Sequence, residues 1–315
     1  MDEFEIIRHL FTPDKKSDSV IVGVGDDGAI LRPDAGRDLV TVVDTMVSGV
    51  HFPEDLNAAD IGFRAVAVNV SDIAAMGARP RWMTLALTLD NADQDWLKEL
   101  SSGIASAASA FGVELVGGDI TRGSEFVISV QITGDVEPGL VMTRRGASPG
   151  DSIYVSGSPG DAALGLSLIQ SGDTQLAGSE YLIGRFKRPD ARLQLGQAIA
   201  PVASAAIDLS DGLYADLGKL LAASGVAGVI ELNDIPLSGA LLRTVDRTDA
   251  LRYALGGGDD YELCITASGD SVIGIGEHLK TPVTKIGRVL EGQGLSCTLG
   301  GEAYDYRDDG YRHFD

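Results

Sequence analysis

Several aspartates in this sequence end an apolar run or stand beside a glycine. In the first half they are Asp26 and Asp27 in VGVGDDG, Asp44 in TVVDT and Asp119 in LVGGDITRG. In the second half they are Asp208 and Asp211 in AIDLSDG, and Asp259 and Asp260 in LGGGDDYEL. Carboxylates at such places offer oxygen donors to a hard cation and leave room for water and substrate oxygens. One aspartate beside glycine is ordinary turn chemistry, but their repetition favours Mg²⁺ shared with phosphates.

Patterns for other metals and other phosphate-binding machinery are absent from the sequence. It has no EF-hand spacing, no GxxxxGK[ST] loop and no protein-kinase signature set. Its four histidines do not pair with cysteines at zinc-ligand spacing. GVGDDG matches the letters of G-x-G-x-x-G, but the AILRP that follows does not indicate a long helix. GASPG at 146–150 precedes a strand, so we interpret Ser148 as a turn residue.

Composition narrows the possible partners. The chain has 315 residues, which is enough for two domains of about 150 residues each. Its net charge of -21 argues against nucleic acid and anionic membranes, and it requires cations wherever phosphates bind. Two cysteines make no disulfide framework, the N-terminus lacks a signal pattern, and no apolar run approaches the roughly 18 residues of a membrane span. We therefore expect a cytoplasmic protein that contacts no membrane.

The stretch FRAVAVNVSDIAAMGARP, residues 63–80, is the clearest helix and must position one of the acids. Val66, Val70 and Ile73 recur at helical spacing. Asn69 and Asp72 lie three residues apart and share a face. Gly77 and Pro80 end the helix. Taken alone, Asp72 is better explained as a solvated residue on an exposed edge; the other acids favour a ligand.

Alternating strands and helices indicate an α/β or α+β protein with two halves. Strands are expected at 19–25, 39–43, 82–89, 113–116, 126–133, 152–155, 205–209, 228–232, 261–266 and 283–289. Further helices are expected at 2–11, 94–111, 162–170, 181–186, 191–199 and 213–223. The basic, Gly/Pro-rich segment TRRGASPGD at 143–151 is the best boundary, and it predicts domains at 1–148 and 149–315.

Eight motifs in this order resemble the thiamine-monophosphate kinases of the aminoimidazole-ribonucleotide-synthetase-like superfamily. They are VGVGDDGA (22–29), VDTMVSGVHF (43–52), AVNVSDIAAMGARP (67–80), GGDITRG (117–123), TRRGASPGD (143–151), AIDLSDGL (206–213), GGGDDYELC (256–264) and GYRHF (310–314). The resemblance implies ATP-dependent phosphorylation of thiamine monophosphate to thiamine diphosphate with several Mg²⁺ ions. It implies a homodimer whose N-terminal domains, which bind metal and nucleotide, pair into a β-barrel. It also implies a C-terminal α/β domain, with ATP in the groove between domains.

The resemblance also assigns residues by position. The implied magnesium ligands are Asp27, Val43, Asp44, Asp72, Asp119, Asp208 and Asp211. The implied nucleotide contacts are Gly118, Asp119, Arg144 and Ser210, and the implied substrate contacts are His51, Asp259 and Tyr311. Val42 and Val43 replace hydroxyl residues that the family often has, so they offer a metal only backbone carbonyls. Position 259 is often glutamate in the family.

The chemistry is consistent with this assignment. Two phosphate-bearing substrates beside six carboxylates need cations to neutralise them and to align an in-line displacement. The acceptor phosphate has a second pKa of about 6, so it needs no strong general base, and no covalent nucleophile is expected. Alternatives are a sibling synthetase that makes an acyl-phosphate or iminophosphate, and a non-catalytic acidic metal- or nucleotide-binding module. Selenophosphate synthetases need an N-terminal Cys or selenocysteine and hydrogenase-maturation relatives a C-terminal Cys, and this sequence has neither.

Overall fold

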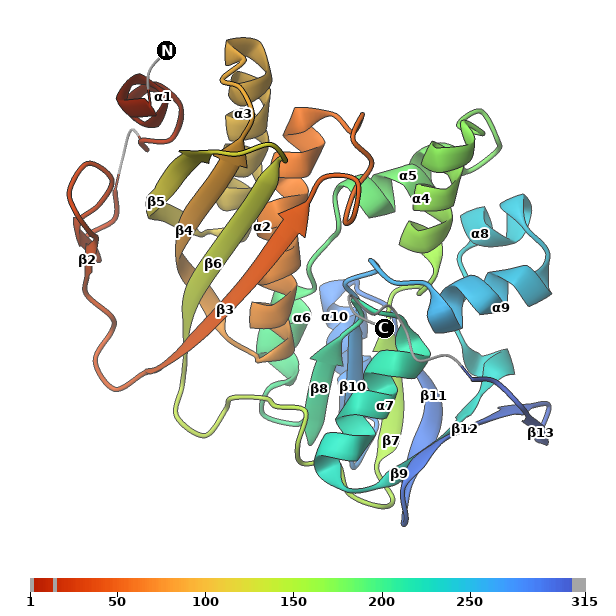
Figure 1. Cartoon of the computed structure of the whole chain (residues 1–315). Helices are drawn as coiled ribbons and strands as arrows, with labels where there is room; N and C mark the ends of the chain where they lie inside the picture. Colours follow the sequence, from red (N-terminus) through yellow and green to blue (C-terminus); the bar gives the residue numbers. More distant parts are fainter. Residues whose placement is uncertain (1–2, 14–15, 308–315) are drawn as a thin grey trace. The chain divides into compact units, whose positions relative to one another are not determined.

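The computed structural model describes residues 3–13 and 16–307, which pack as two compact units (Figure 1). One unit contains Met1–Ile73 and Ala78–Gly139, and the other contains Ala74–Gly77 and Leu140–Asp315. The boundary between residues 148 and 149, which the sequence predicts for the functional domains, stays a prediction.

The first unit is built on an open, mixed four-stranded sheet in the order β3-β6-β4-β5. Its strands are β3 (Asp38–Val47), β4 (Arg79–Leu89), β5 (Glu114–Arg122) and β6 (Val127–Val136). The parallel pair β4 and β5 is joined by α3 (Gln94–Phe111), and the other neighbours are antiparallel. Three short elements precede this sheet: α1 (Glu3–Leu10), β1 (Val20–Val22) and β2 (Ile30–Leu31).

Helix α2 (Ala58–Ala75) is the central helix that the sequence predicts. Asn57 caps it, because its Oδ1 accepts the backbone N–H of Ala59 at 2.9 Å. At the other end Gly77 has a φ of 68°, which only glycine adopts without strain. Helices α2 and α3 lie on the same face of the sheet (Figure 1). They touch closely, since a Cβ on Gly103 would lie 2.0 Å from the carbonyl oxygen of Ala59.

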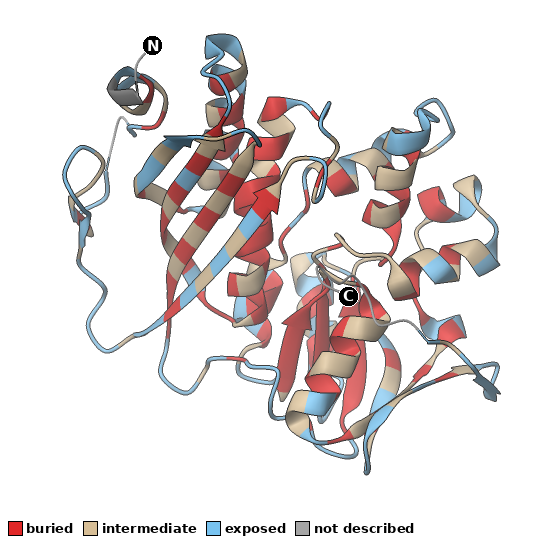
Figure 2. Cartoon of the chain, viewed as in Figure 1, coloured by how far each residue is buried: buried red, intermediate tan, exposed pale blue. Residues whose placement is uncertain are grey.

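Among the residues of the first unit that the structure describes, no helix covers the opposite face of this sheet (Figure 1). Side chains alternate along β3, so that Met46 is buried whereas Leu39 and Val43 are 52% and 64% exposed. Figure 2 shows the same alternation on β4 and β6. The sheet is therefore half-buried, and among the described residues no sheet closes into a barrel.

The second unit contains a mixed seven-stranded sheet in the order β13-β12-β9-β11-β7-β10-β8. Its strands are β7 (Ser152–Ser156), β8 (Ala205–Asp208), β9 (Ala227–Glu231), β10 (Leu263–Ala267), β11 (Val283–Leu290), β12 (Gly294–Leu299) and β13 (Glu302–Tyr304). Only the β9–β12 pair is parallel. Every residue of β7, β8 and β10 is buried, as expected for strands covered on both faces (Figure 2).

Helices cover both faces of this sheet. Leu217 and Leu221 of α7 (Leu213–Ser224) pack with Ile153 and Ile207 of the strands. The other face carries α6 (Leu193–Ile199) and α10 (Ser271–Leu279). A separate helical group packs around its own leucine core. It consists of α4 (Asp161–Ser171), α5 (Ser179–Lys187), α8 (Gly239–Thr244) and α9 (Arg247–Gly256). A 3₁₀ turn at Leu232–Asp234 follows β9.

The predicted α/β class with two parts is confirmed, whereas several elements differ from the prediction. GGD at 117–119 was expected to follow a strand, but it lies inside β5, because that strand continues to Arg122 along β4. Helices α8, α9 and α10 and strands β12 and β13 were not predicted. Within the described ranges, no helix combines the length and the apolar character that crossing a membrane requires.

An ion-pair cluster closes one end of the first unit's sheet. The carboxylate of Asp135 on β6 is fully buried and contacts three guanidinium groups: Arg37 at 2.7 Å, Arg79 at 2.9 Å and Arg81 at 2.5 Å. Burial opposes ionisation of Asp135, but the hydrogen bonds from Arg79 and Arg81 outweigh it and hold the pKa below the usual value. The folded state therefore stabilises the ionised form of the Asp135 carboxyl group.

We expect Asp135→Asn to lower the free energy of unfolding by about 2 kcal/mol at pH 7, because breaking a buried ion pair leaves the remaining charges uncompensated. The native pKa lies below the unfolded value of about 3.9, so this stabilisation is complete above that pH and is lost as pH falls through the native pKa. Urea titrations of wild type and variant should therefore converge below about pH 4.

Asp34→Asn is the matched control. Asp34 contacts the same Arg79 and Arg81, at 2.7 and 3.0 Å, but its side chain is half exposed. Exposed ion pairs stabilise little, so this variant should lose far less stability. Equal losses in the two variants would contradict the assigned role of Asp135.

Candidate functional site

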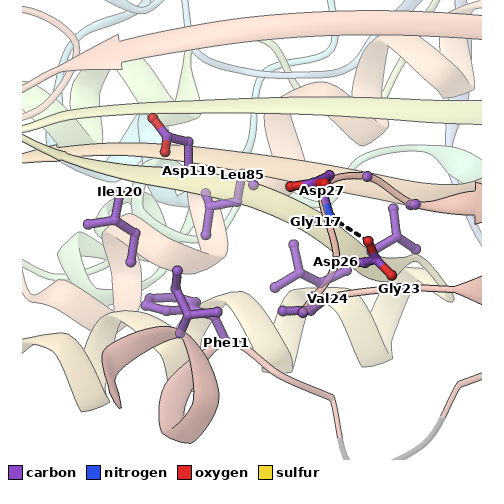
Figure 3. A pocket seen from close by; sticks show the side chains of 16 residues that line it. Phe11, Gly23, Val24, Asp26, Asp27, Leu85, Gly117, Asp119 and Ile120 are labelled. Atoms are coloured by element: carbon purple, nitrogen blue, oxygen red, sulfur yellow. Dashed lines mark hydrogen bonds between the residues drawn. The ribbon is translucent and has the colours of Figure 1, made fainter. Parts of the chain in front are cut away.

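A cavity of about 460 Å³ in the first unit is lined by three of the acids that the sequence analysis singled out, Asp26, Asp27 and Asp119 (Figure 3). It is lined by the glycine-rich turn 23–29, by residues 115–120 of β5, and by apolar side chains that include Phe11. Asp27 and Asp119 both line it. The neighbouring Asp26 accepts the backbone N–H of Asp27 at 2.8 Å, so Asp26 shapes the turn that presents Asp27.

Gly118 brings backbone, rather than a side chain, to this cavity. It pairs with Leu85 of β4, and a Cβ at Gly118 would lie 2.0 Å from the Leu85 carbonyl oxygen. Any side chain at this position would displace β4. Gly118 is therefore explained by the close approach of β4, whereas at the adjacent Gly117 a Cβ would meet nothing within 4 Å, so the main chain of β5 is open there.

Asn69 of α2 binds the backbone of Asp44. The backbone N–H of Asp44 on β3 donates to Oδ1 of Asn69 on α2 at 3.0 Å. Asn69 is fully buried, and its amide group donates to the carbonyl of Ala65 at 3.0 Å, which fixes its orientation. Asp72 lies one turn further on the same face of α2. Burial raises the pKa of Asp44, and a bound cation would reverse that shift.

Strand register separates Asp44 from Asp119. Asp44 pairs with Val130 and through it with Leu85, both of which are buried beneath the helices. Asp119 pairs with Ala86 on the exposed face, in the row that also contains Ser129 and Thr45. Directly paired residues point to the same side of a sheet. Asp44 and Asp119 therefore project from opposite faces, and the predicted ligands of this unit form two groups.

His51 lies in the loop after β3 with its ring orientation fixed. Its Nδ1 accepts the backbone N–H of Val47 at 3.0 Å. An Nδ1 that accepts leaves the ring proton of the neutral imidazole on Nε2. His51 therefore presents Nε2 as a hydrogen-bond donor, the property that contact with a phosphate oxygen requires.

In the second unit, Asp208, Ser210 and Asp211 follow one another across the turn from β8 into α7. Asp216, which is buried on α7, accepts the backbone N–H groups of Ser210 at 3.0 Å and Asp211 at 2.9 Å. Lys219 bridges Asp211 and Asp216. Burial raises the pKa of Asp216, and Lys219 opposes that rise. This arrangement holds the turn, and sequence reasoning did not identify Asp216 or Lys219, although the two lie three residues apart on α7.

The loop that contains Asp259 joins this turn. The backbone N–H of Asp259 donates to the carbonyl of Ser210 at 2.9 Å, and that of Tyr261 donates to Leu209 at 2.9 Å. The hydroxyl of Tyr261 contacts the Asp259 carboxylate at 3.3 Å. A predicted substrate contact and a predicted nucleotide contact thus belong to neighbouring, hydrogen-bonded loops.

The remaining predicted residues contribute less to this geometry. Arg144 has an exposed side chain, and its carbonyl accepts the Ser224 hydroxyl at 2.9 Å. Val43 offers only its backbone, and Tyr311 lies outside the described residues. In residues 3–13 and 16–307, no three His, Cys, Asp or Glu side chains form a group that could hold a metal ion. These ligand and contact assignments stay predictions.

Comparison with known proteins gives the family. Residues 25–136 match the family model of the AIR synthase related protein, N-terminal domain, and residues 148–300 match that of its C-terminal domain. The thiamine-monophosphate kinase of Escherichia coli K12 is 43% identical over 321 residues, which cover 99% of this chain and 98% of that protein.

Solved structures agree. The thiamine-monophosphate kinase of Stenotrophomonas maltophilia K279a has a TM-score of 0.88 and 44% identity, covering 96% of this chain and 98% of its own. A structure described as AaThiL complexed with AMPPCP and TMP has a TM-score of 0.80 and 33% identity, covering 92% of both chains. Because these similarities include both units, the chain belongs to the thiamine-monophosphate kinase family, with the two-domain fold of AIR synthase related proteins.

Proposed function

We propose that the protein transfers the γ-phosphoryl group of ATP to thiamine monophosphate and releases thiamine diphosphate and ADP. The observation that supports this most strongly is the similarity, over 92% of both chains, to a relative described with AMPPCP and TMP, an ATP analogue and the acceptor. The bond between the β–γ bridging oxygen of ATP and the γ-phosphorus breaks as a phosphate oxygen of the acceptor attacks. We propose an in-line displacement, which needs no covalent intermediate.

Mg²⁺ is part of this proposal. The donors in the two groups of acids are oxygens only, which suits a hard cation and not zinc. Mg²⁺ commonly takes one or two carboxylates and completes its coordination with water and substrate phosphates. Asp44 is bound to Asn69, one helical turn from Asp72, and Asp27 and Asp119 line one cavity; both arrangements fit a metal that takes one or two carboxylates. When bound, the ions would neutralise the phosphates that the carboxylates otherwise repel.

The chain's own residues would orient the substrates. Gly117, where a Cβ would meet nothing within 4 Å, would let phosphate oxygens approach the backbone of β5, and Arg144 offers a guanidinium that matches phosphate bidentately. Nε2 of His51 would donate to the acceptor phosphate, with Asp259 and Tyr311 contacting the rest of that substrate. Catalysis is then mainly positioning and neutralisation of charge, because the acceptor phosphate is largely deprotonated at neutral pH.

We further propose a homodimer in which the open faces of the four-stranded sheets pair into a β-barrel. The support is the uncovered face that bears Leu39 and Val43, two large apolar side chains that water should not solvate without cost. Residues 1–148 would form the domain that dimerises and that binds metal and nucleotide.

A cytoplasmic location is also a proposal, supported by two free, buried thiols, Cys264 and Cys297.

The direct test is product formation from ATP, Mg²⁺ and thiamine monophosphate, with ADP measured enzymatically and the thiamine product identified by mass. We expect thiamine diphosphate only when all three are present. ATP turnover without thiamine monophosphate, or none with it, would contradict the proposal and favour a sibling synthetase.

We expect Asp72→Asn and Asp208→Asn to fold normally and to lose at least about 100-fold in kcat, because metal-based charge stabilisation is worth several kcal/mol. EDTA should abolish wild-type turnover, and Mg²⁺ should restore it. Asp95→Asn, on the exposed surface of α3, is the control that should remain fully active. Full activity of both Asp72→Asn and Asp208→Asn would refute the metal assignment.

We expect Asn69→Ala to raise the Mg²⁺ concentration at half-maximal rate by about tenfold, because Asn69 orients the strand that bears Asp44. Asn57→Ala removes the cap of the same helix and should cost about 1 kcal/mol of stability without changing the Mg²⁺ requirement. A parallel shift in the Mg²⁺ dependence of both variants would assign the effect to helix stability instead.

A further inference from the structure

Two loops of the second unit are bound to each other along their backbones. Besides the bonds from Asp259 to Ser210 and from Tyr261 to Leu209, the N–H of Leu209 donates to the carbonyl of Glu262 at 2.8 Å. A Cβ on Gly258 would lie 2.4 Å from the carbonyl oxygen of Ser210, so the contact leaves no room for a side chain. The loop of the predicted nucleotide contact cannot move without the loop of Asp259.

The backbone of the Asp259 loop is held in an unfavourable conformation. Asp259 has a φ of 70° and Tyr261 a φ of 53°, a region that residues other than glycine rarely occupy. Such conformations persist only where the surrounding structure imposes them. The one residue between these two positions is Asp260.

Asp260 has the contacts to impose this conformation. Its side chain is fully buried, and its two oxygens accept the backbone N–H groups of Gly160 at 2.6 Å and Ala162 at 3.2 Å. These N–H groups form the N-terminus of α4, where the helix dipole favours a carboxylate. Arg185 of α5 also donates to the carbonyl of Asp260 at 3.1 Å.

Glu262 fixes the other end of the loop. Arg192 binds its carboxylate with two nitrogens, each at 2.6 Å, and Arg185 adds a third contact at 2.8 Å. The hydroxyl of Ser156 donates to the same group at 2.5 Å. Since Glu262 begins the return into β10, it anchors the loop to the sheet, and the conformation between the anchor and Asp259 depends on Asp260.

We propose that Asp260 is a positioning residue: by binding the N-terminus of α4 it holds the Asp259 turn against the Ser210 loop and so aligns acceptor and nucleotide contacts. This inference rests on the proposed function only in that it assigns Asp259 to the acceptor. Asp260 itself touches neither substrate.

Amide hydrogen exchange tests the positioning without using activity. In Asp260→Asn one oxygen becomes an NH₂ group that faces a backbone donor. Protection of the Asp259 and Tyr261 amides should therefore fall about tenfold, the equilibrium effect of leaving one buried backbone N–H without its acceptor. Asp151→Asn is the control: Asp151 is buried in the same unit and accepts from Ser148 and Ser204. It should leave both amides protected, and equal protection in wild type and Asp260→Asn would overturn the proposal.

A double-mutant cycle tests whether Asp260 acts through Asp259. Asp260→Asn should raise KM for thiamine monophosphate about tenfold while KM for ATP changes less than about threefold, and it should add little to Asp259→Ala. Additive effects, or a KM that changes no more than in Asp151→Asn, would refute the role. If the Asp259 and Tyr261 amides exchange as expected but the wild-type protein makes no thiamine diphosphate, the proposed function is refuted, whereas the positioning role of Asp260 is not.

A measurement on the unaltered protein covers the case in which Asp260→Asn does not fold. If Asp260 joins α4 to the loop, the amides of Ala162, Asp259 and Tyr261 should open as one unit when exchange is followed at rising urea concentrations. If the free energy of opening of the Ala162 amide differs from that of the Asp259 and Tyr261 amides, the proposal is overturned.

Discussion

The cost of removing a carboxylate from water governs how this acidic chain is built. Four deeply buried acids have compensating partners: Asp135 has three guanidinium groups, Glu262 has two, and Asp216 and Asp260 accept pairs of backbone N–H groups. A buried charge without partners would cost several kcal/mol and would be neutralised instead. These acids therefore fasten elements together, and in the second unit they hold the two loops that bear the predicted contacts.

The acids predicted to meet ligands have different surroundings. Asp27 and Asp119 reach an open cavity, and burial raises the pKa of Asp44 without a compensating arginine or lysine among the causes of the shift. In the proposed function, a cation would supply to Asp44 what arginines supply to Asp135 and Glu262.

Local patterns in the sequence predicted what local forces decide. Helices α2 and α3 follow from apolar spacing and from terminating glycines, and the full extent of α3 was predicted. Pairing between strands that are distant in the sequence decided the features that were not predicted. β5 continues through Gly117, Gly118 and Asp119 because β4 lies alongside, and the side of the sheet to which Asp119 points depends on register. Helix α9 was missed because polar and charged residues interrupt its apolar pattern.

Neighbouring residues with opposite roles mark the limit of sequence reasoning at the site. Asp259 and Asp260 are identical in type and adjacent, yet Asp260 is enclosed by the N-terminus of α4 while Asp259 stands in a left-handed turn beside Ser210. Asp26 and Asp27 are not divided in this way, because both line the cavity, and Asp26 in addition accepts the backbone N–H of Asp27. The letters DD alone therefore do not tell a support from a contact. For Asp260 the hydrogen-bond partners that decide its role, Gly160 and Ala162, come from a distant part of the chain.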